Sequence, residues 1–503
     1  MLEHPFGGVF VFGGKSEIKS VLMLKIYNSL TKQVEEIRPL QPGKVEMYTC
    51  GPTVYSYPTI GNWRTYVLSD LVLRALRIEG FEVDSVMNMT DVGHLTGDNL
   101  GDADTGEDRL EKAAAKEKKT AWGIAKYYGE DFVDSFGKLN LVKPLLFSKA
   151  TDHIKEQIDL VQRIEKAGFA YRIADGIYFD VAEYEKKGNI YGKLSNLEEI
   201  KPGARVEINT EKRDQRDFAL WKFSPAGAKR DMEWESPWGM GFPGWHIECS
   251  AMSMKYLGDQ LDIHVGGEDL KSTHHPNEIA QSESVTGKKP FVRYWMHGAF
   301  LLVDGGRMGK SLGNAYTLHD IIEKGYSPMA LRYYYLSAHY RKQMNFSWEG
   351  MEGVSNSYKK LKKEFLALRV EGGQDKNIFG NKAEVELSGR EAFFRDEFVS
   401  AVEDDLNMSA ALAVARTVLK DEKLNSFEKR RLVENFDKVF GLKLAERDEV
   451  PADIPAEVME MVNKREEMRK TKQWAESDAL RKEIEAKGYK ISDFFDGVKV
   501  EKI

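Results

Sequence analysis

The sequence predicts an α/β protein in which a parallel sheet with an inserted subdomain is followed by a helical bundle and a small helical tail domain. Three observations support this fold class. Residues 44–89 run in the order strand, loop, helix, strand, which is typical of a βαβ unit in a parallel sheet. After about residue 340 strands nearly vanish and charged amphipathic helices take over. The length of 503 residues indicates two to four domains.

The first unit begins with short strands in residues 24–49 and continues into the Gly- and Pro-rich loop CGPTVYSYPTIGN over residues 50–62. Apolar residues recur at helical spacing over residues 63–78, and Gly80 is a stop signal. Residues 81–89 return to strand. Because ligands of parallel sheets bind at the carboxyl ends of the strands, the loop at 50–62 is a candidate site.

A polar stretch over residues 97–119 predicts an ordered loop or a mobile flap, and the segment from there to about residue 235 interrupts the sheet pattern as an inserted subdomain. Its expected elements are helices near 120–140 and 150–168 and a hairpin over 171–181 whose turn is Asp175 and Gly176. Sheet character resumes with a strand at 261–265, a helix near 274–285 and a strand at 291–297. Polar linkers near 372–382 and 445–455 then separate the later helices.

The composition is that of a globular protein, with 42% hydrophobic and 30% charged residues and a formal net charge of −7. This charge does not argue against a nucleic-acid partner, because such binding needs only a local positive face. No stretch has the apolar length of a membrane span, and the N-terminus lacks the features of a secretory signal. Two cysteines in the whole chain argue against a disulfide scaffold, so we expect a reducing cytoplasm and no membrane.

The loop after the first βαβ strand delivers Thr59, Ile60, Gly61 and Asn62 to the start of a helix. A helix N-terminus offers free backbone N–H groups and a positive dipole end, which suits a phosphate. The alternative is a loop that merely turns tightly into a helix, as most Gly-rich βα turns do.

A second glycine-rich loop, DGGRMGKSLGN over residues 304–314, carries Arg307, Lys310 and Ser311. Such a loop could fold its cations over a polyphosphate. Its glycine and lysine spacing does not fit the Walker pattern, and a solvated basic hairpin is the alternative.

The candidate metal ligands are Cys50, Cys249, His274 and Glu278. His274 and Glu278 are four residues apart and would share one face of a helix, as zinc-binding pairs do. The set lacks a C-x-x-C signature, and free cysteines are more often small buried hydrophobes. Asp269, which follows a strand and two glycines, could reach a ribose hydroxyl or simply cap the next helix.

Together these residues resemble one family. The segments CGPTVYSYPTIGN, NMTDVGHLT, DFALWK, GWHIECSAMSMKYLG, DIHVGGEDLKSTHHPNEIAQSE, RMGKSLGN and LRYYYLSAHYRKQMNFS are similar, in this order, to cysteinyl-tRNA synthetases. The resemblance runs from about Leu24 to the C-terminus. Residues 59–62 match the HIGH motif of class I synthetases, and residues 307–311 match KMSKS.

The resemblance implies a class I Rossmann-like catalytic domain and an ATP-dependent ligation of L-cysteine to tRNA(Cys) through a cysteinyl-adenylate. It implies one zinc ion per chain, held by Cys50, Cys249, His274 and Glu278, and ATP bound with Mg²⁺. The implied catalytic residues are Thr59, Asn62 and Lys310; ATP contacts are Thr59, Gly61, Asn62, Asp269, Met308, Lys310 and Ser311; and cysteine contacts are Cys50, Thr90, Trp245 and His274. A monomer is expected.

The expected domains are an N-terminal extension over 1–22, either disordered or an artefact of start-site choice, a catalytic domain over 23–345 with a connective insertion at about 120–240, a tRNA-binding helical bundle over 346–445 and an anticodon-recognition domain over 450–503. The family's usual start, MLKIYNSL, begins here at Met23.

Several positions depart from the family pattern. Thr59 and Asn62 replace both histidines of HIGH, and KMSKS has become Arg307, Met308, Gly309, Lys310 and Ser311. The segment KSTHHPNE stands where MFPHHENE is usual, with both presumed ligands kept. Thr59 leaves open an inactive paralogue that only binds RNA. A cysteine:aminosugar ligase is the other alternative, although it typically lacks the roughly 160 residues that follow the catalytic core here.

Overall fold

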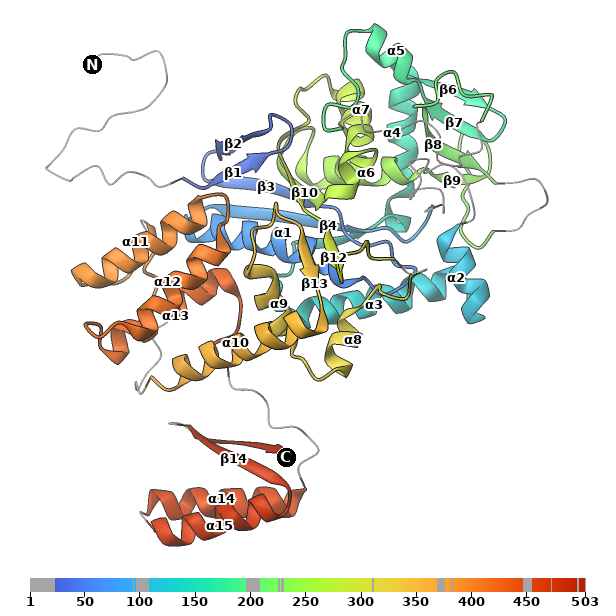
Figure 1. Ribbon diagram of the computed structural model, residues 1–503. Coiled ribbons are helices and arrows are strands. Elements are labelled where there is room, and N and C mark those ends of the chain that lie inside the picture. The colour runs from blue at the N-terminus through green and yellow to red at the C-terminus, as the bar shows by residue number, and fades with distance from the viewer. Residues whose placement is uncertain are drawn as a thin grey trace, which may run out of the picture.

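The computed structural model places a five-stranded parallel sheet at the centre of the molecule, in the order β11-β10-β3-β4-β5 (Figure 1). Its strands are β3 (Lys44–Thr49), β4 (Glu82–Met89), β5 (Leu146–Lys149), β10 (Leu261–Gly267) and β11 (Val292–Gly298). The structure describes residues 23–93, 95, 108–195, 209–224, 227, 230–309, 312–368, 376–380, 383–446, 455–471, 473–494 and 497–502. The extension that the sequence separates at 1–22 lies outside them.

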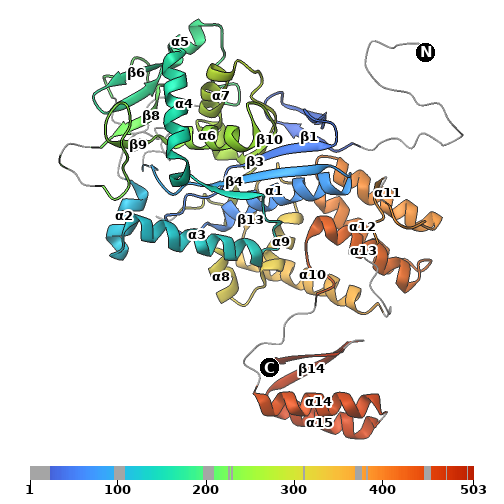
Figure 2. The same ribbon diagram turned by 180° about the vertical axis from the view of Figure 1, so that it is seen from behind.

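The sheet is doubly wound. Helix α1 (Ile60–Ile78) links β3 to β4, and helix α7 (His274–Thr286) links β10 to β11 in the opposite direction along the sheet. Figures 1 and 2 show α1 on one face, with α6 (Trp245–Leu257) and α7 on the other. The strand order therefore reverses between β3 and β10, and a crevice opens at their carboxyl ends, where such folds bind ligands.

Helix α1 starts three residues earlier than its apolar periodicity predicts, because Thr59 and Asn62 form a capping box. Asn62 N donates to Thr59 Oγ1 at 3.4 Å, and Thr59 N donates to Asn62 Oδ1 at 2.9 Å. The helix ends at the predicted stop, where Gly80 takes a φ of 95°.

The segment between β4 and α6 contains the predicted helices and hairpin, with two differences from the prediction. Part of the polar stretch expected as a loop forms a helix. Asp108 caps the N-terminus of this helix, and the helix buries the side chains of Leu110 and Ala114. The hairpin turn is Ala174–Asp175, and Gly176 belongs to a strand: a Cβ at Gly176 would lie 2.4 Å from the Trp221 carbonyl oxygen. Besides β5, the segment between β4 and α6 contains α2 (Arg109–Glu117), α3 (Ala121–Lys138), η2 (Thr151–His153), α4 (Ile154–Lys166), α5 (Val181–Lys186) and a four-stranded antiparallel sheet of β6 (Ala170–Ile173), β7 (Gly176–Phe179), β8 (Phe218–Phe223) and β9 (Gly241–Pro243).

Short elements flank the central sheet. They are the hairpin β1 (Lys25–Asn28) and β2 (Gln33–Glu36), η4 (Glu268–Lys271), the parallel pair β12 (Leu301–Val303) and β13 (Met344–Phe346), α8 (Leu318–Glu323) and α9 (Pro328–Leu336). The bundle consists of α10 (Trp348–Leu366), α11 (Gly389–Glu403), α12 (Met408–Lys420) and α13 (Ser426–Phe440). One hydrophobic core runs from the sheet into this bundle and extends to Leu444.

The tail domain has a core of its own, to which Val458, Ile484 and Val500 contribute. It contains α14 (Ala456–Lys470) and α15 (Trp474–Ala486), as the helical periodicity predicts, and ends in an antiparallel hairpin of β14 (Tyr489–Phe494) and β15 (Gly497–Lys502) that the sequence analysis does not predict. Nowhere in the described ranges does a helix combine the length and apolar character needed to cross a membrane.

Candidate functional site

The four predicted metal ligands meet in the crevice between β3 and β10. Cys50 directly follows β3, Cys249 lies in α6, and His274 and Glu278 stand one turn apart at the start of α7. Their ligand atoms all lie within 4.8 Å of one another, and each residue is at most 7% exposed. The two Sγ atoms are 3.9 Å apart, and His274 Nε2 lies 3.1 Å from Glu278 Oε1. Two thiols, an imidazole and a carboxylate are donors that suit zinc.

The pKa values of two of these groups are raised, with that of His274 brought to about 10, against the effect of burial, by Cys249 and Glu278, and the pKa values of the other two are lowered. Burial raises the pKa of Cys50 well above its usual range. Burial also opposes ionisation of Cys249, but the hydrogen bond with Cys50 and the neighbouring His274 lower its pKa to about 6. Burial likewise opposes the charge of Glu278, yet His264 and His274 hold its pKa at about 2. The cluster thus holds a carboxylate and one thiol that ionises readily.

Four further histidines, His246, His264, His275 and His297, surround this cluster. His264 Nε2 lies 3.0 Å from Glu278 Oε2, and His275 Nε2 lies 3.4 Å from Cys50 Sγ. Cys50, His264, His275 and Glu278 form a second set whose ligand atoms also lie within 4.8 Å. No sequence motif singles out these histidines, although five of the ten histidines fall within residues 246–297.

The two residues that the resemblance assigns to the amino-acid pocket, Trp245 and Thr90, lie beside the cluster. The Trp245 ring centroid is 4.3 Å from that of His274. Thr90 Oγ1 donates to Glu248 Oε2 at 2.8 Å, and Glu248 directly precedes Cys249. Glu248 is fully buried, which raises its pKa well above the usual range of a carboxyl. Burial thus disfavours the charged form of Glu248 beside the candidate metal ligands.

The two predicted phosphate loops also meet. A Cβ built at Gly61 would lie 3.7 Å from Met308 Sδ, so the second loop packs against the start of α1. Downstream of that loop, Tyr316 O accepts a hydrogen bond from Ile60 N at 2.8 Å. Asn62 and Asp269 are exposed there, with Asp269 in η4 just after β10. Lys310 and Ser311 lie outside the described residues.

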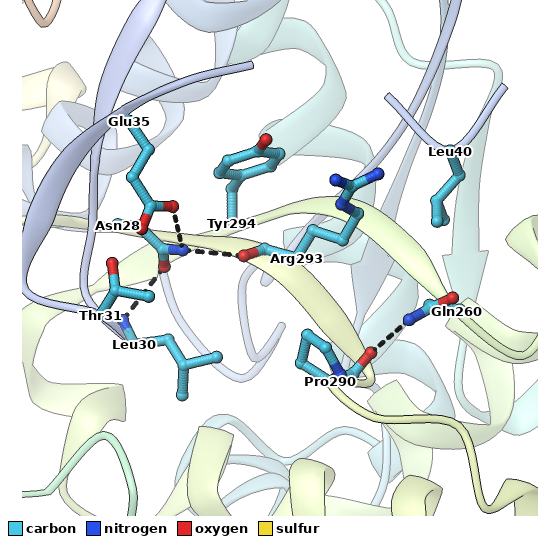
Figure 3. A pocket seen from close by; sticks show the side chains of 9 residues that line it. All are labelled: Asn28, Leu30, Thr31, Glu35, Leu40, Gln260, Pro290, Arg293 and Tyr294. Atoms are coloured by element: carbon cyan, nitrogen blue, oxygen red, sulfur yellow. Dashed lines mark hydrogen bonds between the residues drawn. The ribbon is translucent and has the colours of Figure 1, made fainter. Parts of the chain in front are cut away.

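A cavity at the other end of the strands is separate from this site (Figure 3). It is lined by Asn28, Leu30, Thr31, Glu35, Leu40, Gln260, Pro290, Arg293 and Tyr294. Gln260 and Arg293 stand at the amino ends of β10 and β11, opposite the metal ligands. Asn28 Nδ2 donates to Glu35 Oε2 at 2.9 Å and to Arg293 O at 2.8 Å across its wall.

Known proteins match both the catalytic part and nearly the whole length of this chain. Residues 36–356, more than half of the chain, match the family model of the class I (C) tRNA synthetase catalytic domain. A cysteine–tRNA ligase of Burkholderia lata is 41% identical over 477 residues, covering 94% of this chain and 96% of its own. That of Thermus thermophilus is 38% identical over 487 residues, covering 94% and 98%. The chain belongs to the cysteinyl-tRNA synthetase family.

Solved structures outside the cysteinyl-tRNA synthetases share the fold. A Mycobacterium tuberculosis methionyl-tRNA synthetase in complex with methionyl-adenylate has a TM-score of 0.52 at 15% identity, covering 79% of this chain and 90% of its own. A leucyl-tRNA synthetase of Agrobacterium radiobacter in a ternary complex has a TM-score of 0.53 at 12% identity, covering 81% and 85%. The class I fold inferred from the sequence of this cysteinyl-tRNA synthetase is confirmed.

Proposed function

We propose that the protein joins L-cysteine to the 3′ end of tRNA(Cys) in two steps, with the buried Cys50, Cys249, His274 and Glu278 cluster as the observation that carries this assignment. In the first step a carboxylate oxygen of cysteine attacks the α-phosphorus of ATP, and pyrophosphate leaves. In the second a hydroxyl of the terminal ribose attacks the carbonyl carbon of the adenylate, and AMP leaves. No covalent enzyme intermediate is needed, so the protein acts by positioning and by stabilising charge.

The start of α1 would hold the ATP phosphates, with Gly61 allowing close approach and its free N–H groups facing the anion. Thr59 and Asn62, which cap each other here, are the side chains that would turn toward phosphate oxygens. Asp269 would accept from the ribose, while Met308, Lys310 and Ser311 would close over the triphosphate and its Mg²⁺. These assignments rest on the convergence of the two loops and on the family resemblance.

The metal cluster would select the amino acid. Zinc bonds a thiolate far better than a hydroxyl, which lets it separate cysteine from serine by coordination rather than by shape. Thr90, Trp245 and His274 would bound a pocket for a small side chain. Apolar pockets separate near-isosteric side chains by only about 10 to 200-fold, so this selection could make an editing site unnecessary.

The proposed function is tested by amino-acid-dependent ATP–pyrophosphate exchange. We expect exchange with cysteine to exceed that with serine or alanine by at least about 1000-fold in kcat/KM, more than shape alone supplies. Exchange with serine at the same rate as with cysteine would refute the selection by metal coordination. A zinc-loaded, folded protein that shows no exchange with any amino acid would favour the inactive paralogue.

A second prediction concerns Lys310. Because its loop is glycine-rich and can close during the reaction, Lys310→Ala is expected to lower the kcat of exchange by about 100-fold while the KM for ATP changes by less than about threefold. Steady-state exchange kinetics measure both constants. Lys324→Ala, which removes a cation over the Trp348 ring near the same loop, is the matched control. If Lys310→Ala only raises the KM for ATP, then Lys310 binds ATP in the ground state and does not stabilise the transition state.

The helical bundle at 346–445 and the domain at 450–503 would bind the tRNA, the bundle by bracing it and the tail by reading unpaired anticodon bases. The described tail argues against an aminosugar ligase.

Two thiols kept free at one buried site suit a reducing compartment, so we place the reaction in the cytoplasm.

A further inference from the structure

Arg64, in the second turn of α1, holds a loop that is distant in sequence. Its side chain is buried, with the residue 4% exposed, and burial lowers its pKa to about 10. The guanidinium donates to the carbonyl oxygens of Ala299 at 2.6 Å, Phe300 at 2.9 Å, His339 at 3.2 Å, Tyr340 at 3.4 Å and Lys342 at 2.5 Å. Residues 339–342 connect α9 to β13, so Arg64 fixes their backbone against the catalytic helix.

The side chains of the same loop converge on one carboxylate of the helical bundle. Asp405, in the turn between α11 and α12, is 2% exposed. It accepts from Tyr340 OH at 2.6 Å and Arg341 Nε at 2.6 Å, and His339 Nε2 lies 3.6 Å away. It also accepts from the backbone N of Tyr27 in β1 at 2.8 Å. The loop therefore presents carbonyls to Arg64 and side chains to Asp405.

The turn that carries Asp405 is strained. Asp405 and Leu406 are consecutive residues with φ values of 52° and 56°, a region that residues other than glycine rarely adopt. Such strain persists only where the surroundings impose the conformation. The surroundings here are the loop and β1, because Asp405 N also donates to Lys25 O at 3.1 Å.

Helix α9, which precedes this loop, also contacts the start of α1. Tyr335, four residues before His339, donates its hydroxyl to the carbonyl oxygen of Ile60 at 2.7 Å. Ile60 is the first residue of α1, at the proposed phosphate site. The first two turns of α1 are thus held by residues 335–342. Among the described residues, a separate junction involving Arg332 and Arg74 ties the later part of α1 to the end of α13.

We propose that Asp405 is a positioning residue for adenylate formation, acting through the loop at 339–342 and Arg64 to set where the start of α1 meets the ATP phosphates. This inference rests on the proposed function, since it presumes that the helix start binds ATP. A displacement of about 1 Å at a reacting centre can cost about 100-fold in rate, so a carboxylate outside the site can act this way.

The test compares Asp405→Asn with Asp437→Asn in the full-length protein. Asp437 is also a bundle carboxylate, accepting from Leu442 N at 2.7 Å and Leu444 N at 2.8 Å, but it lies at the other junction. Titration of active sites by adenylate formation, followed by exchange kinetics, gives kcat per competent site. We expect Asp405→Asn to lower this kcat by about tenfold or more with little change in the KM for ATP, and Asp437→Asn to leave it within about twofold.

A double-mutant cycle checks the route. If Asp405 acts through Arg64, then Arg64→Lys combined with Asp405→Asn should be no slower than Arg64→Lys alone. Should Arg64→Lys not fold, Tyr340→Phe replaces it, and its combination with Asp405→Asn should match Asp405→Asn alone. Multiplicative effects, or a loss confined to the fraction of competent sites, would overturn the proposal. Absence of exchange in the wild-type protein would instead overturn the proposed function.

Discussion

Cys249→Ser is expected to lower zinc affinity and cysteine-dependent exchange by at least about 100-fold, because changes merely outside the ligand shell already cost 10- to 100-fold. Cys249 supplies half of the thiols in the chain, is 1% exposed, and has its pKa lowered to about 6 by Cys50 and His274 against the effect of burial. Serine is nearly the same size but offers a hydroxyl that does not ionise at neutral pH. The packing of α6 should survive while the donor is lost.

Elemental analysis and competition with a chromogenic chelator measure the zinc, and exchange assays measure the activity. Ser253→Ala is the matched control, since Ser253 lies one turn further along α6 and is also buried. It should keep both zinc and exchange. Wild-type protein that contains no zinc after careful purification, or a Cys249→Ser variant that binds zinc as tightly as the wild type, would contradict the site assignment.

Deletion of residues 450–503 is expected to leave exchange within about twofold and to reduce tRNA charging by about 100-fold or more, because base contacts worth about 1–3 kcal/mol each would be lost together. The tail has its own core, and the core shared by sheet and bundle extends only to Leu444 among the described residues. Removal of the tail should therefore leave the hydrophobic core of the sheet and bundle buried.

A point variant sharpens this test. Trp474 at the start of α15 is 55% exposed, and Arg469 Cζ lies 5.6 Å from its ring centroid. An exposed ring beside a cation suits stacking with an unpaired base, so Trp474→Ala should lower charging without changing exchange. Arg465, by contrast, is fully buried and is not available for a phosphate. A folded, truncated protein that charges tRNA as well as the full chain would show that the tail is not a tRNA reader.

Four of the five strands of the central sheet were predicted from short strand-like segments bounded by turn and stop signals such as Gly80, whereas β5, which has only four residues, was missed. The predictions from sequence were wrong where a local preference conflicts with contacts to residues distant in the chain. Glycine is typical of turns, so Gly176 was placed in the turn. It belongs to β7 instead, because the backbone of β8 lies so close that no larger residue fits there. The final hairpin β14–β15 was missed although Tyr489, Ile491, Val498 and Val500 alternate with polar residues, because this alternation directly follows a long charged helix.

The four candidate metal ligands, which the structure brings together, could be singled out in the sequence because cysteine is scarce and because a spacing of four residues places His274 and Glu278 on one helical face. The surrounding histidines were not found, since His246, His264 and His297 come from different elements and only the folded sheet brings them together. The same reason hid Arg64 and Asp405. Arg64 contacts Ala299 at a separation of 235 residues, and Asp405 contacts Arg341 at a separation of 64, so no local spacing pattern marks either residue.

The distance along the chain between the two thiols affects the order of folding. Cys50 and Cys249 are 199 residues apart, whereas the ligands of a zinc finger lie within one short segment that the metal itself can fold. During synthesis, β3 is made long before β10, the strand that pairs with it, and before α7, the helix that carries His274 and Glu278. A metal ion bound at this cluster would therefore need a largely completed scaffold, because all four candidate ligands exist only once synthesis has passed Glu278.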